Sequence, residues 1–325
     1  MLIRIFTSEE NMNHTALKLA IAIAATVTSM SAALSSRTWV STTGSDNVVS
    51  TWANASLMCG ATNPCRTFQR AIQYTAAGGE VDVLTAGDYG SFTITKAITI
   101  DGGNLAYVQT TTNGAAITVT AGVADSVVIR NLSIDLPMNT PLATATLGIS
   151  WTQGFALYLE DLSIFGGSTG VWANSTQSGN GGPYAYLQNV TIRASCLGAV
   201  FLSGSSSLSM KAALDRVTVE QSAGEGATLA NGRFAIARSS FAFAGAHGVL
   251  CGSNCQLSIS DSTVVNSNIG LTASSGSTIR VSNTTISGNT SALLPNGGGS
   301  ILSFGNNAVA GNVNQETFSG AVPLK

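Results

Sequence analysis

The sequence repeats a short motif every 21 to 30 residues, and this repeat restricts the fold more than any other feature. Each copy has a small or polar turn residue followed by an apolar–polar–apolar triplet, as in NLSI and DLSI. The copies begin at Asn131, Asp161, Asn189, Arg216, Ser240, Ser262 and Asn283, and a degenerate copy begins at Asn306. Alternation with a period of two residues is typical of β-strands. The chain is therefore expected to be a solenoid of short strands.

Each repeat has room for three strands. A second alternating segment precedes the turn residue, as in LYLED from Leu157 and YAYLQ from Tyr184, and a third apolar segment follows a glycine, as in GVWA from Gly170. In the first copy of the triplet, Leu132 and Ile134 are expected to face inward. Strands of successive repeats that hydrogen-bond about 4.8 Å apart bury their inner faces in one shared core.

This pattern resembles the right-handed parallel β-helix proteins of the pectin-lyase-like superfamily. The resemblance covers roughly Gly79 to Asn312, and it rests on the strand pattern, the Asn/Asp/Ser turn positions and the stacked apolar residues. It implies an all-β fold, a right-handed parallel β-helix. The alternative solenoid is a leucine-rich repeat, whose tight L-x-x-L-x-L consensus these variable repeats lack.

The N-terminal residues 1–33 are expected to be a secretory signal peptide. Lys18 precedes an apolar run from Leu19 to Val27, and small residues follow it. Met12 is the alternative start, because the acidic residues before it suit a signal peptide badly. A membrane anchor is a second interpretation, but the run is shorter than the roughly 20 residues that a span needs. The expected location is secreted, periplasmic or at the cell surface, without membrane attachment after cleavage.

Residues 34–78 are expected to cap the solenoid with an edge strand and one short helix. Thr67 suits the N-cap of this helix and Gly78 the position after its end, and one apolar face is formed by Phe68, Ala71 and Ile72. The β-helix is expected over residues 79–312. Residues 313–325 are expected to form a C-terminal tail or a weak cap.

The five cysteines suit an oxidising compartment. The pairs Cys59 with Cys65 and Cys251 with Cys255 are close enough in sequence to form two disulfides. Cys196 is then left over as a buried free thiol, with a reactive thiol as the alternative. No cysteine or histidine spacing matches a zinc site, so no metal or cofactor is expected; calcium remains chemically compatible but has no motif here.

Low charge limits the expected partners. Only 9% of the residues are charged and the net charge is −2, which argues against a nucleic-acid partner, because that needs a basic face. An extracellular polysaccharide is the expected partner, and the oligomeric state is left open.

Alignment of the repeats predicts two charged pairs between neighbouring rungs. At the position before the glycine of the third segment, one repeat carries Glu225 and the next repeat carries His247. At the position after the triplet, one repeat carries Arg193 and the next carries Glu220. The two aligned series are Thr169, Leu197, Glu225, His247, Ile269 and Asp135, Phe165, Arg193, Glu220, Ala244, Asn266. The four charged residues are candidates for catalysis, because carboxylates beside a histidine or arginine can transfer protons or hold a cation. The alternative is two solvated ion pairs, each contributing about 1 kcal/mol at most.

Comparison with known activities of the superfamily argues against a recognisable catalytic set. Polygalacturonase-like hydrolases carry Asn-Thr-Asp, Asp-Asp, Gly-His-Gly and Arg-Ile-Lys. In place of Asn-Thr-Asp this chain has NTT at Asn283, which lacks the acid, and no two aspartates are adjacent. In place of Gly-His-Gly it has AHG at Ala246, which keeps the histidine and one glycine, and TIR at Thr278 differs from Arg-Ile-Lys. The resemblance therefore does not imply a specific reaction; a polysaccharide lyase or hydrolase is the enzymatic alternative.

Aromatic residues concentrate in two neighbouring repeats. Seven lie within the 36 residues from Trp151 to Tyr186, in a chain that is only 6% aromatic, and Tyr158 and Tyr186 are expected in the same outward column. The candidates for substrate binding are Trp151, Tyr158, Trp172, Tyr184 and Tyr186, with packing under the loop that begins at Asn174 as the alternative. The leading hypothesis is a protein that binds polysaccharide along this face; a cell-surface or adhesion scaffold is the third class.

Overall fold

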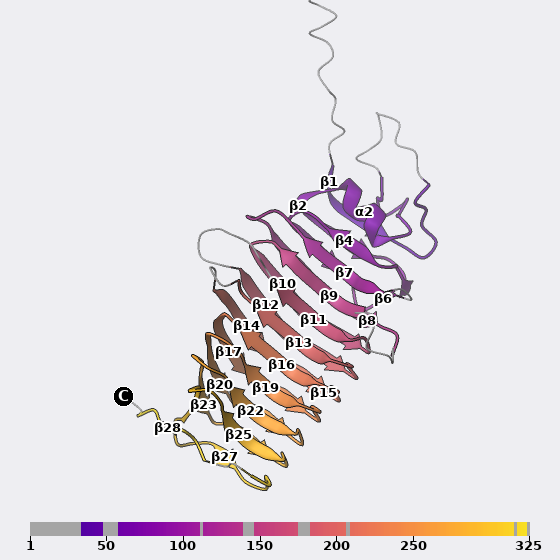
Figure 1. The fold of residues 1–325 in the computed structure, drawn as a ribbon. Coiled ribbons are helices and arrows are strands. Elements are labelled where there is room, and N and C mark those ends of the chain that lie inside the picture. The colour runs from indigo at the N-terminus through magenta and orange to yellow at the C-terminus, as the bar shows by residue number, and fades with distance from the viewer. Residues whose placement is uncertain are drawn as a thin grey trace, which may run out of the picture.

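The chain forms a parallel β-solenoid, in which strands of successive turns lie side by side (Figure 1). The computed structural model describes residues 34–47, 58–110, 113–138, 146–174, 183–205, 209–314 and 317–323. The all-β parallel architecture expected from the repeat is confirmed. The expected signal peptide, residues 1–33, lies outside the described residues, and so does most of the loop after Asn174.

Two sheets run along the solenoid, and every strand pair within them is parallel. The first, in front in Figure 1, has nine strands in the described part of the chain: β4 (Phe92–Ile94), β7 (Gly114–Thr120), β9 (Thr146–Gln153), β11 (Thr169–Asn174), β13 (Gly198–Ser203), β16 (Glu225–Ala230), β19 (His247–Cys251), β22 (Ile269–Ala273) and β25 (Ser291–Pro295).

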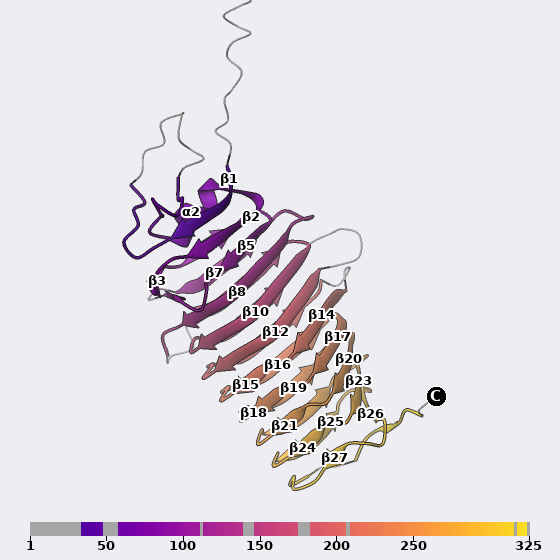
Figure 2. The ribbon, with the colours of Figure 1, turned by 180° about the vertical axis from the view of Figure 1, so that it is seen from behind.

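The second sheet, in front in Figure 2, is bent and has nineteen strands among the described residues. Its strands are β1 (Ser35–Val40), β2 (Thr75–Val83), β3 (Gly87–Asp88), β5 (Ile98–Asp101), β6 (Ala106–Gln109), β8 (Ser126–Asp135), β10 (Ala156–Phe165), β12 (Tyr184–Arg193), β14 (Met210–Asp215), β15 (Thr218–Glu220), β17 (Gly232–Ala237), β18 (Ser240–Ala242), β20 (Cys255–Ser260), β21 (Thr263–Val265), β23 (Thr278–Ser282), β24 (Thr285–Ser287), β26 (Ser300–Ser303), β27 (Ala308–Val309) and β28 (Gly320–Ala321).

The bend falls on the turn residue of the sequence repeat. The backbone angle φ is +55° at Asn131, +53° at Asp161 and +53° at Asn189, a region that asparagine and aspartate enter more readily than other non-glycine residues. Each kink directs the residues before it and those after it to different faces of the solenoid. We call the strand segments before the bend the first limb and those after it the second limb.

The core is a set of inward columns that follow the alternation. Leu132 and Ile134 are buried and Ser133 is exposed, as the sequence predicts. On the first limb, Leu157 pairs in register with Ala185 and Leu159 with Leu187, so like positions stack from rung to rung. This stacking removes a continuous apolar surface from water, which is the main stabilising contribution of such a fold.

The N-terminal end carries the expected edge strand and helix. Strand β1 pairs with β2, and the helix α2 (Phe68–Tyr74) buries Phe68, Ala71 and Ile72; the Thr67 side chain accepts a hydrogen bond from the Arg70 amide as N-cap. The expected helix end near Gly78 was wrong. The helix stops at Tyr74, because the next residues already pair in β2, and the Gly78 amide donates to the carbonyl of Ala97.

Both expected disulfides are confirmed. The Cα atoms of Cys59 and Cys65 are 4.7 Å apart, and those of Cys251 and Cys255 are 5.5 Å apart. The free Cys196 is half-buried rather than buried, because it lies in the turn between β12 and β13. Within the part of the chain that the structure describes, no helix has the length and apolar character needed to cross a membrane.

Candidate functional site

An aromatic surface forms on the outward face of the first limb. Tyr158 of β10 pairs in register with Tyr186 of β12, and their rings stack with centroids 4.8 Å apart and planes 5° apart. The predicted outward tyrosine column is thereby confirmed. The neighbouring column holds Tyr184, whose ring packs at 5.2 Å against Phe155.

A groove of about 390 Å³ continues from these tyrosines toward the C-terminal rungs. In the column of Tyr186 the next two rungs carry Ala213 and Ala235, and these small side chains leave the depression. In the column of Tyr184 the next two rungs carry Lys211 and Arg233. We call this depression the tyrosine groove; it is lined by Tyr184, Tyr186, Lys211, Ala212, Ala213, Arg233, Phe234 and Ala235.

Lys211 is positioned against Tyr184. Its ammonium group lies 5.1 Å from the centroid of the tyrosine ring and 3.3 Å from the phenol oxygen. A cation over an aromatic face is attracted by the ring quadrupole, by about 0.5–1 kcal/mol at an exposed site. The Tyr184 ring is therefore held between Phe155 on one side and Lys211 on the other.

Two of the five aromatic candidates lie elsewhere. Trp151 is 0% exposed, because it alternates with Ile149 on the inner face of β9, and its indole Nε1 donates to the carbonyl of Gln153 at 3.0 Å. The expectation that Trp151 binds a ligand was therefore wrong. Trp172 is on the outer face of the nine-stranded sheet, stacked on Phe201 with centroids 5.9 Å apart.

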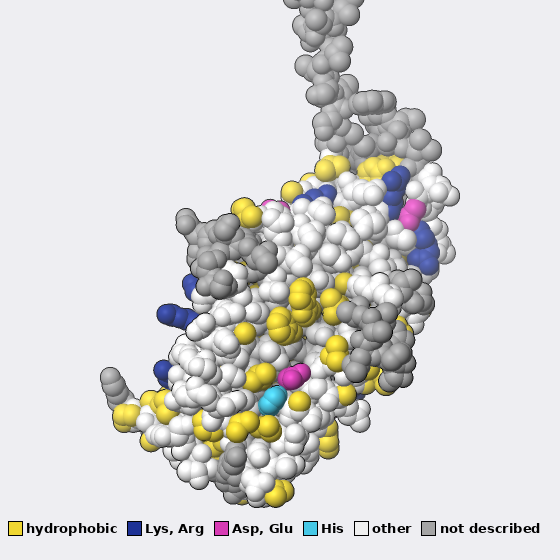
Figure 3. All heavy atoms as spheres, viewed as in Figure 1, with side chains coloured by type: hydrophobic (Ala, Val, Ile, Leu, Met, Phe, Trp, Pro, Cys, Tyr) yellow, Lys and Arg dark blue, Asp and Glu magenta, His cyan; other side chains and the backbone are white. Residues whose placement is uncertain are grey.

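The two charged pairs expected from the alignment are present, on different sheets. Arg193 Nε lies 2.9 Å from Glu220 Oε2, at the C-terminal ends of β12 and β15 in the bent sheet. His247 Nδ1 lies 3.7 Å from Glu225 Oε1 on the nine-stranded sheet. Figure 3 shows an acidic side chain beside a histidine on that face, below a group of hydrophobic side chains. Glu220 and Glu225 flank the same turn, so the pairs are neighbours across it.

Three residues of the alignment, Leu197, Ala244 and Asn266, were misplaced. Glu225 pairs in register with Gly198, Glu220 pairs with Ala242, and Ala242 pairs with Val265. The turns between limbs differ in length, so equal spacing from the triplet does not mean equal position. Gly198 places no side chain beside the Glu225 carboxylate; a Cβ there would lie 3.8 Å from Oε2, an ordinary van der Waals contact.

The environment of Glu225 favours its ionised form. Its interaction with the His247 side chain lowers the pKa of Glu225 below the ordinary value, and partial burial opposes this shift. His247 Nδ1 is buried and lies beyond hydrogen-bond distance of the carboxylate. The other carboxylate oxygen, Oε2, lies on the side of Gly198.

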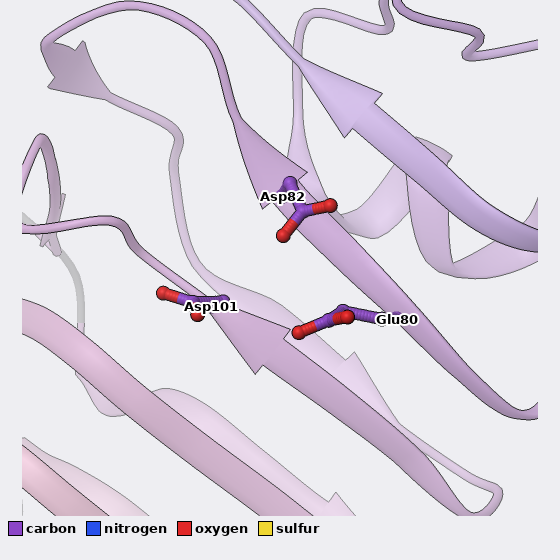
Figure 4. Close-up of side chains that lie close together, drawn as sticks. All are labelled: Glu80, Asp82 and Asp101. Atoms are coloured by element: carbon purple, nitrogen blue, oxygen red, sulfur yellow. The ribbon is translucent and has the colours of Figure 1, made fainter.

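An acidic cluster near the N-terminal end did not emerge from the sequence. Glu80 and Asp82 of β2 and Asp101 of β5 place one oxygen each within 4.8 Å of one another (Figure 4). Arg130 lies 2.7 Å from Glu80 and 2.8 Å from Asp101, and Arg37 pairs with Asp82. These two guanidinium groups offset most of the negative charge, so the cluster is an ion-pair network across strands.

Hydrogen bonds stabilise the ionised form of the central carboxylate in this network. Burial alone acts to raise the pKa of Asp101, but hydrogen bonds from the Asn131 side chain, the Gly103 amide and Arg130 lower it overall. The polar groups that face Asp101 are thereby satisfied within the chain.

The cations of the tyrosine groove also went unnoticed in the sequence. Their signal is present: YAYL from Tyr184, KAAL from Lys211 and RFAI from Arg233 occupy the same position of three successive rungs. Alignment of the segments before the bend, rather than of the triplets after it, would have placed Lys211 and Arg233 beside the tyrosines.

Comparison with known proteins agrees with the architecture. Residues 147–321 match the family described as right handed beta helix region. No curated protein matches the sequence. The similar solved structures include the enzymatically active domain of tailspike protein 2 of bacteriophage CBA120, at 16% identity and a TM-score of 0.53, covering 75% of this chain and 40% of that one.

Two further structures are similar at low identity. The GH136 lacto-N-biosidase of Eubacterium ramulus is 11% identical with a TM-score of 0.55, covering 88% of this chain and 66% of that one. Pectate lyase Pel9A is 12% identical with a TM-score of 0.50, covering 89% and 78%. This chain thus spans about two fifths of the tailspike. Since the family match covers more than half of the 325 residues and the strands of successive turns pair in parallel, the protein belongs to the right-handed β-helix family.

Proposed function

We propose that this protein binds a polysaccharide in the tyrosine groove. The observation that carries the proposal is the outward stack of Tyr158 on Tyr186, continued by a groove that Tyr184 borders. Apolar C–H faces of sugar rings pack on aromatic faces, and a phenol adds a hydrogen-bonding group at the edge. Tyr186 is 39% exposed, so its ring is available to a ligand.

The geometry of the solenoid suits a chain-like ligand. Successive rungs are about 4.8 Å apart, so equivalent groups recur along the axis at a regular spacing. A ligand chain that contacts Tyr158, Tyr186 and the alanines of the next rungs would run along this axis. Tyr184 is already held by Phe155 and Lys211, which lowers the entropy lost when a ligand orders the side chain.

The structural relatives support this proposal by analogy only. Two of them have names that refer to carbohydrates: one is a lacto-N-biosidase, and the other is a pectate lyase. Because one fold serves many functions, the proposal depends on the groove and not on the fold.

The test is a Tyr158→Ala/Tyr186→Ala double variant. The wild-type protein is screened on a glycan array, and the best ligand is titrated by calorimetry. If each ring contributes about 1 kcal/mol, the double variant binds about thirty-fold more weakly. Tyr107→Ala is the matched control, since Tyr107 is also 39% exposed but lies on β6, away from the groove. Unchanged binding by the double variant refutes the proposed groove.

A second candidate function is a polysaccharide lyase or hydrolase centred on Glu225 and His247. The observation in its favour is the half-buried pair beside Gly198, on the sheet that also carries the stack of Trp172 on Phe201. An ionised carboxylate can accept a proton from a bound sugar, and a histidine can donate one. The ion pair of Arg193 with Glu220 lies across the adjacent turn.

The enzymatic candidate is tested by turnover. Polyuronates and neutral glycans are incubated with the protein, and products are followed by the ultraviolet absorbance of unsaturated sugars and by a reducing-sugar assay. Glu225→Gln is expected to abolish the activity, whereas Glu160→Gln on the first limb retains it. No turnover on either class of glycan counts against an enzyme. Absence of both turnover and glycan binding favours a surface scaffold.

A further inference from the structure

We propose that the tyrosine groove selects a polysaccharide that carries negative charges, and that Lys211 and Arg233 bind its carboxylate or sulfate groups. This inference rests on the proposed function and adds the charge of the ligand to it. It concerns the outward face of the first limb, a different sheet from the one that carries Glu225 and His247.

The first argument is the placement of two like charges. Lys211 of β14 and Arg233 of β17 are partners in register, with exposed side chains on the same face of neighbouring parallel strands. Like charges directly opposite each other on neighbouring strands destabilise a sheet. The packing of the solenoid therefore gains nothing from this arrangement, and a bound anion would relieve the repulsion.

The second argument is the absence of acidic residues from these columns. Among the described residues, no carboxylate lies within ion-pair distance of Lys211 or Arg233. The column of Lys211 continues with Gln256 and Thr278, and the column of Ala213 continues with Ser258 and then Arg280. Arg280 adds a third cation at the C-terminal side, where it donates to Gln256 at 3.2 Å.

The nearest acid on the first limb is already paired. Asp215, at the end of β14, forms ion pairs with Arg238, at 2.6 Å, and with Arg216, at 3.4 Å. Its charge is offset by these two arginines, so it does not neutralise the groove. In a chain with a net charge of −2, this cationic patch would attract an anionic ligand selectively.

The third argument is the fit of the groups to an acidic sugar. The planar guanidinium of Arg233 can form two parallel hydrogen bonds to a carboxylate or sulfate. The ammonium of Lys211 is a point charge already positioned over Tyr184. Ala213 and Ala235 leave room for the sugar rings beside both cations. The tyrosines then bind the ring face while the cations bind the acidic substituents.

The test compares acidic and neutral probes by calorimetry. The carboxylated arm uses an oligogalacturonide and its carboxyl-reduced form; the sulfated arm uses dextran sulfate and unmodified dextran of equal length. The proposal expects one acidic probe, or both, to bind more tightly than its neutral form, and the tighter acidic arm identifies the anionic group. Equal affinity of acidic and neutral forms in both arms overturns it.

Charge-removing variants separate this proposal from the proposed function. Lys211→Gln and Arg233→Gln are each expected to weaken the acidic probe about five-fold, the upper end for an exposed ion pair. Arg233→Gln is expected to leave the neutral probe unchanged, whereas Lys211→Gln also removes a contact of Tyr184 and is expected to weaken the neutral probe less than the acidic one. Arg37→Gln is the control, since its side chain is 56% exposed at the N-terminal end of the solenoid. Equal melting temperatures establish that the variants are folded.

Two outcomes distinguish failure of the charge selection from failure of the proposed glycan binding. If Lys211→Gln and Arg233→Gln bind the acidic probe as the wild type does, while Tyr158→Ala/Tyr186→Ala loses binding, the charge selection is refuted and the glycan groove stands. If the wild type binds no probe and no glycan of the array, both proposals are refuted together.

Discussion

Asn289 is the residue whose replacement most directly tests how the rungs are held together. It is 1% exposed in the turn after β24. Its side-chain Nδ2 donates to the carbonyl of Val264 at 3.1 Å and to Asn312 Oδ1 at 3.0 Å, and its Oδ1 accepts from the Ser267 amide at 2.9 Å. One side chain thereby connects groups of three successive rungs.

The cost of Asn289→Ala follows from the groups left behind. The Ser267 amide and the Asn312 side-chain oxygen each lose one partner, and the Val264 carbonyl loses one acceptor interaction. An unsatisfied buried polar group costs about 1–3 kcal/mol. The Ser267 amide is left buried without a substitute partner, and the Asn312 oxygen and the Val264 carbonyl lose less. We therefore expect Asn289→Ala to lower the free energy of unfolding by about 2–4 kcal/mol.

The measurement combines urea unfolding, followed by far-ultraviolet circular dichroism, with hydrogen exchange of the Ser267 amide. Asn268→Ala is the matched control, because Asn268 is exposed in the preceding rung, and surface changes of this kind stay within about 0.5 kcal/mol. The reasoning is refuted if Asn289→Ala unfolds at the same urea concentration as the control, or if protection of the Ser267 amide is unchanged.

Three further predictions follow from individual contacts. Trp151→Ala removes a fully buried indole and is expected to cost about 3–5 kcal/mol by chemical denaturation; a loss below 1 kcal/mol would contradict its burial in the core. Reduction of the Cys251–Cys255 disulfide opens a very short loop, so the loss of stability is expected to be only about 2 kcal/mol; it is measured as the difference in unfolding with and without reductant in a Cys59→Ala/Cys65→Ala variant, which lacks the other disulfide, and no difference would show that the loop is held by its other contacts. Because the pKa of Glu225 is depressed in the folded state, its stabilising effect is present above the unfolded pKa of the carboxyl and is lost as the pH falls through the folded value. Glu225→Gln is therefore expected to flatten the dependence of unfolding free energy on pH in the acidic range, and an identical profile would argue against the interaction with His247.

Much of the fold was predictable because the repeat is local. The triplet after each turn residue specified which side chains face inward, as Leu132 and Ile134 do. The polar turn residue itself follows from the backbone, since Asn131 and Asp161 adopt a positive φ. The N-cap at Thr67 and both disulfides depend on short spacings, and these were also correct.

The candidate site was predictable only in part. Tyr158 and Tyr186 stand at the same offset in two long rungs, so their stacking followed from the alignment. Gly198 was missed as the neighbour of Glu225, because the turns between limbs differ in length and shift the register. Lys211 and Arg233 were missed because they precede the triplet on which the alignment was based.

The sequence by itself determined the repeat, the alternation of inner and outer residues and the residues able to make the bend, because each of these depends on neighbours a few positions apart. Only the tertiary structure decided which outward residues meet. Lys211 and Arg233 are 22 positions apart in the chain, and their position in one groove with the tyrosines depends on the parallel register of four strands. Backbone hydrogen bonds between rungs set that register, and rungs of 21 to 30 residues do not encode it in any single spacing.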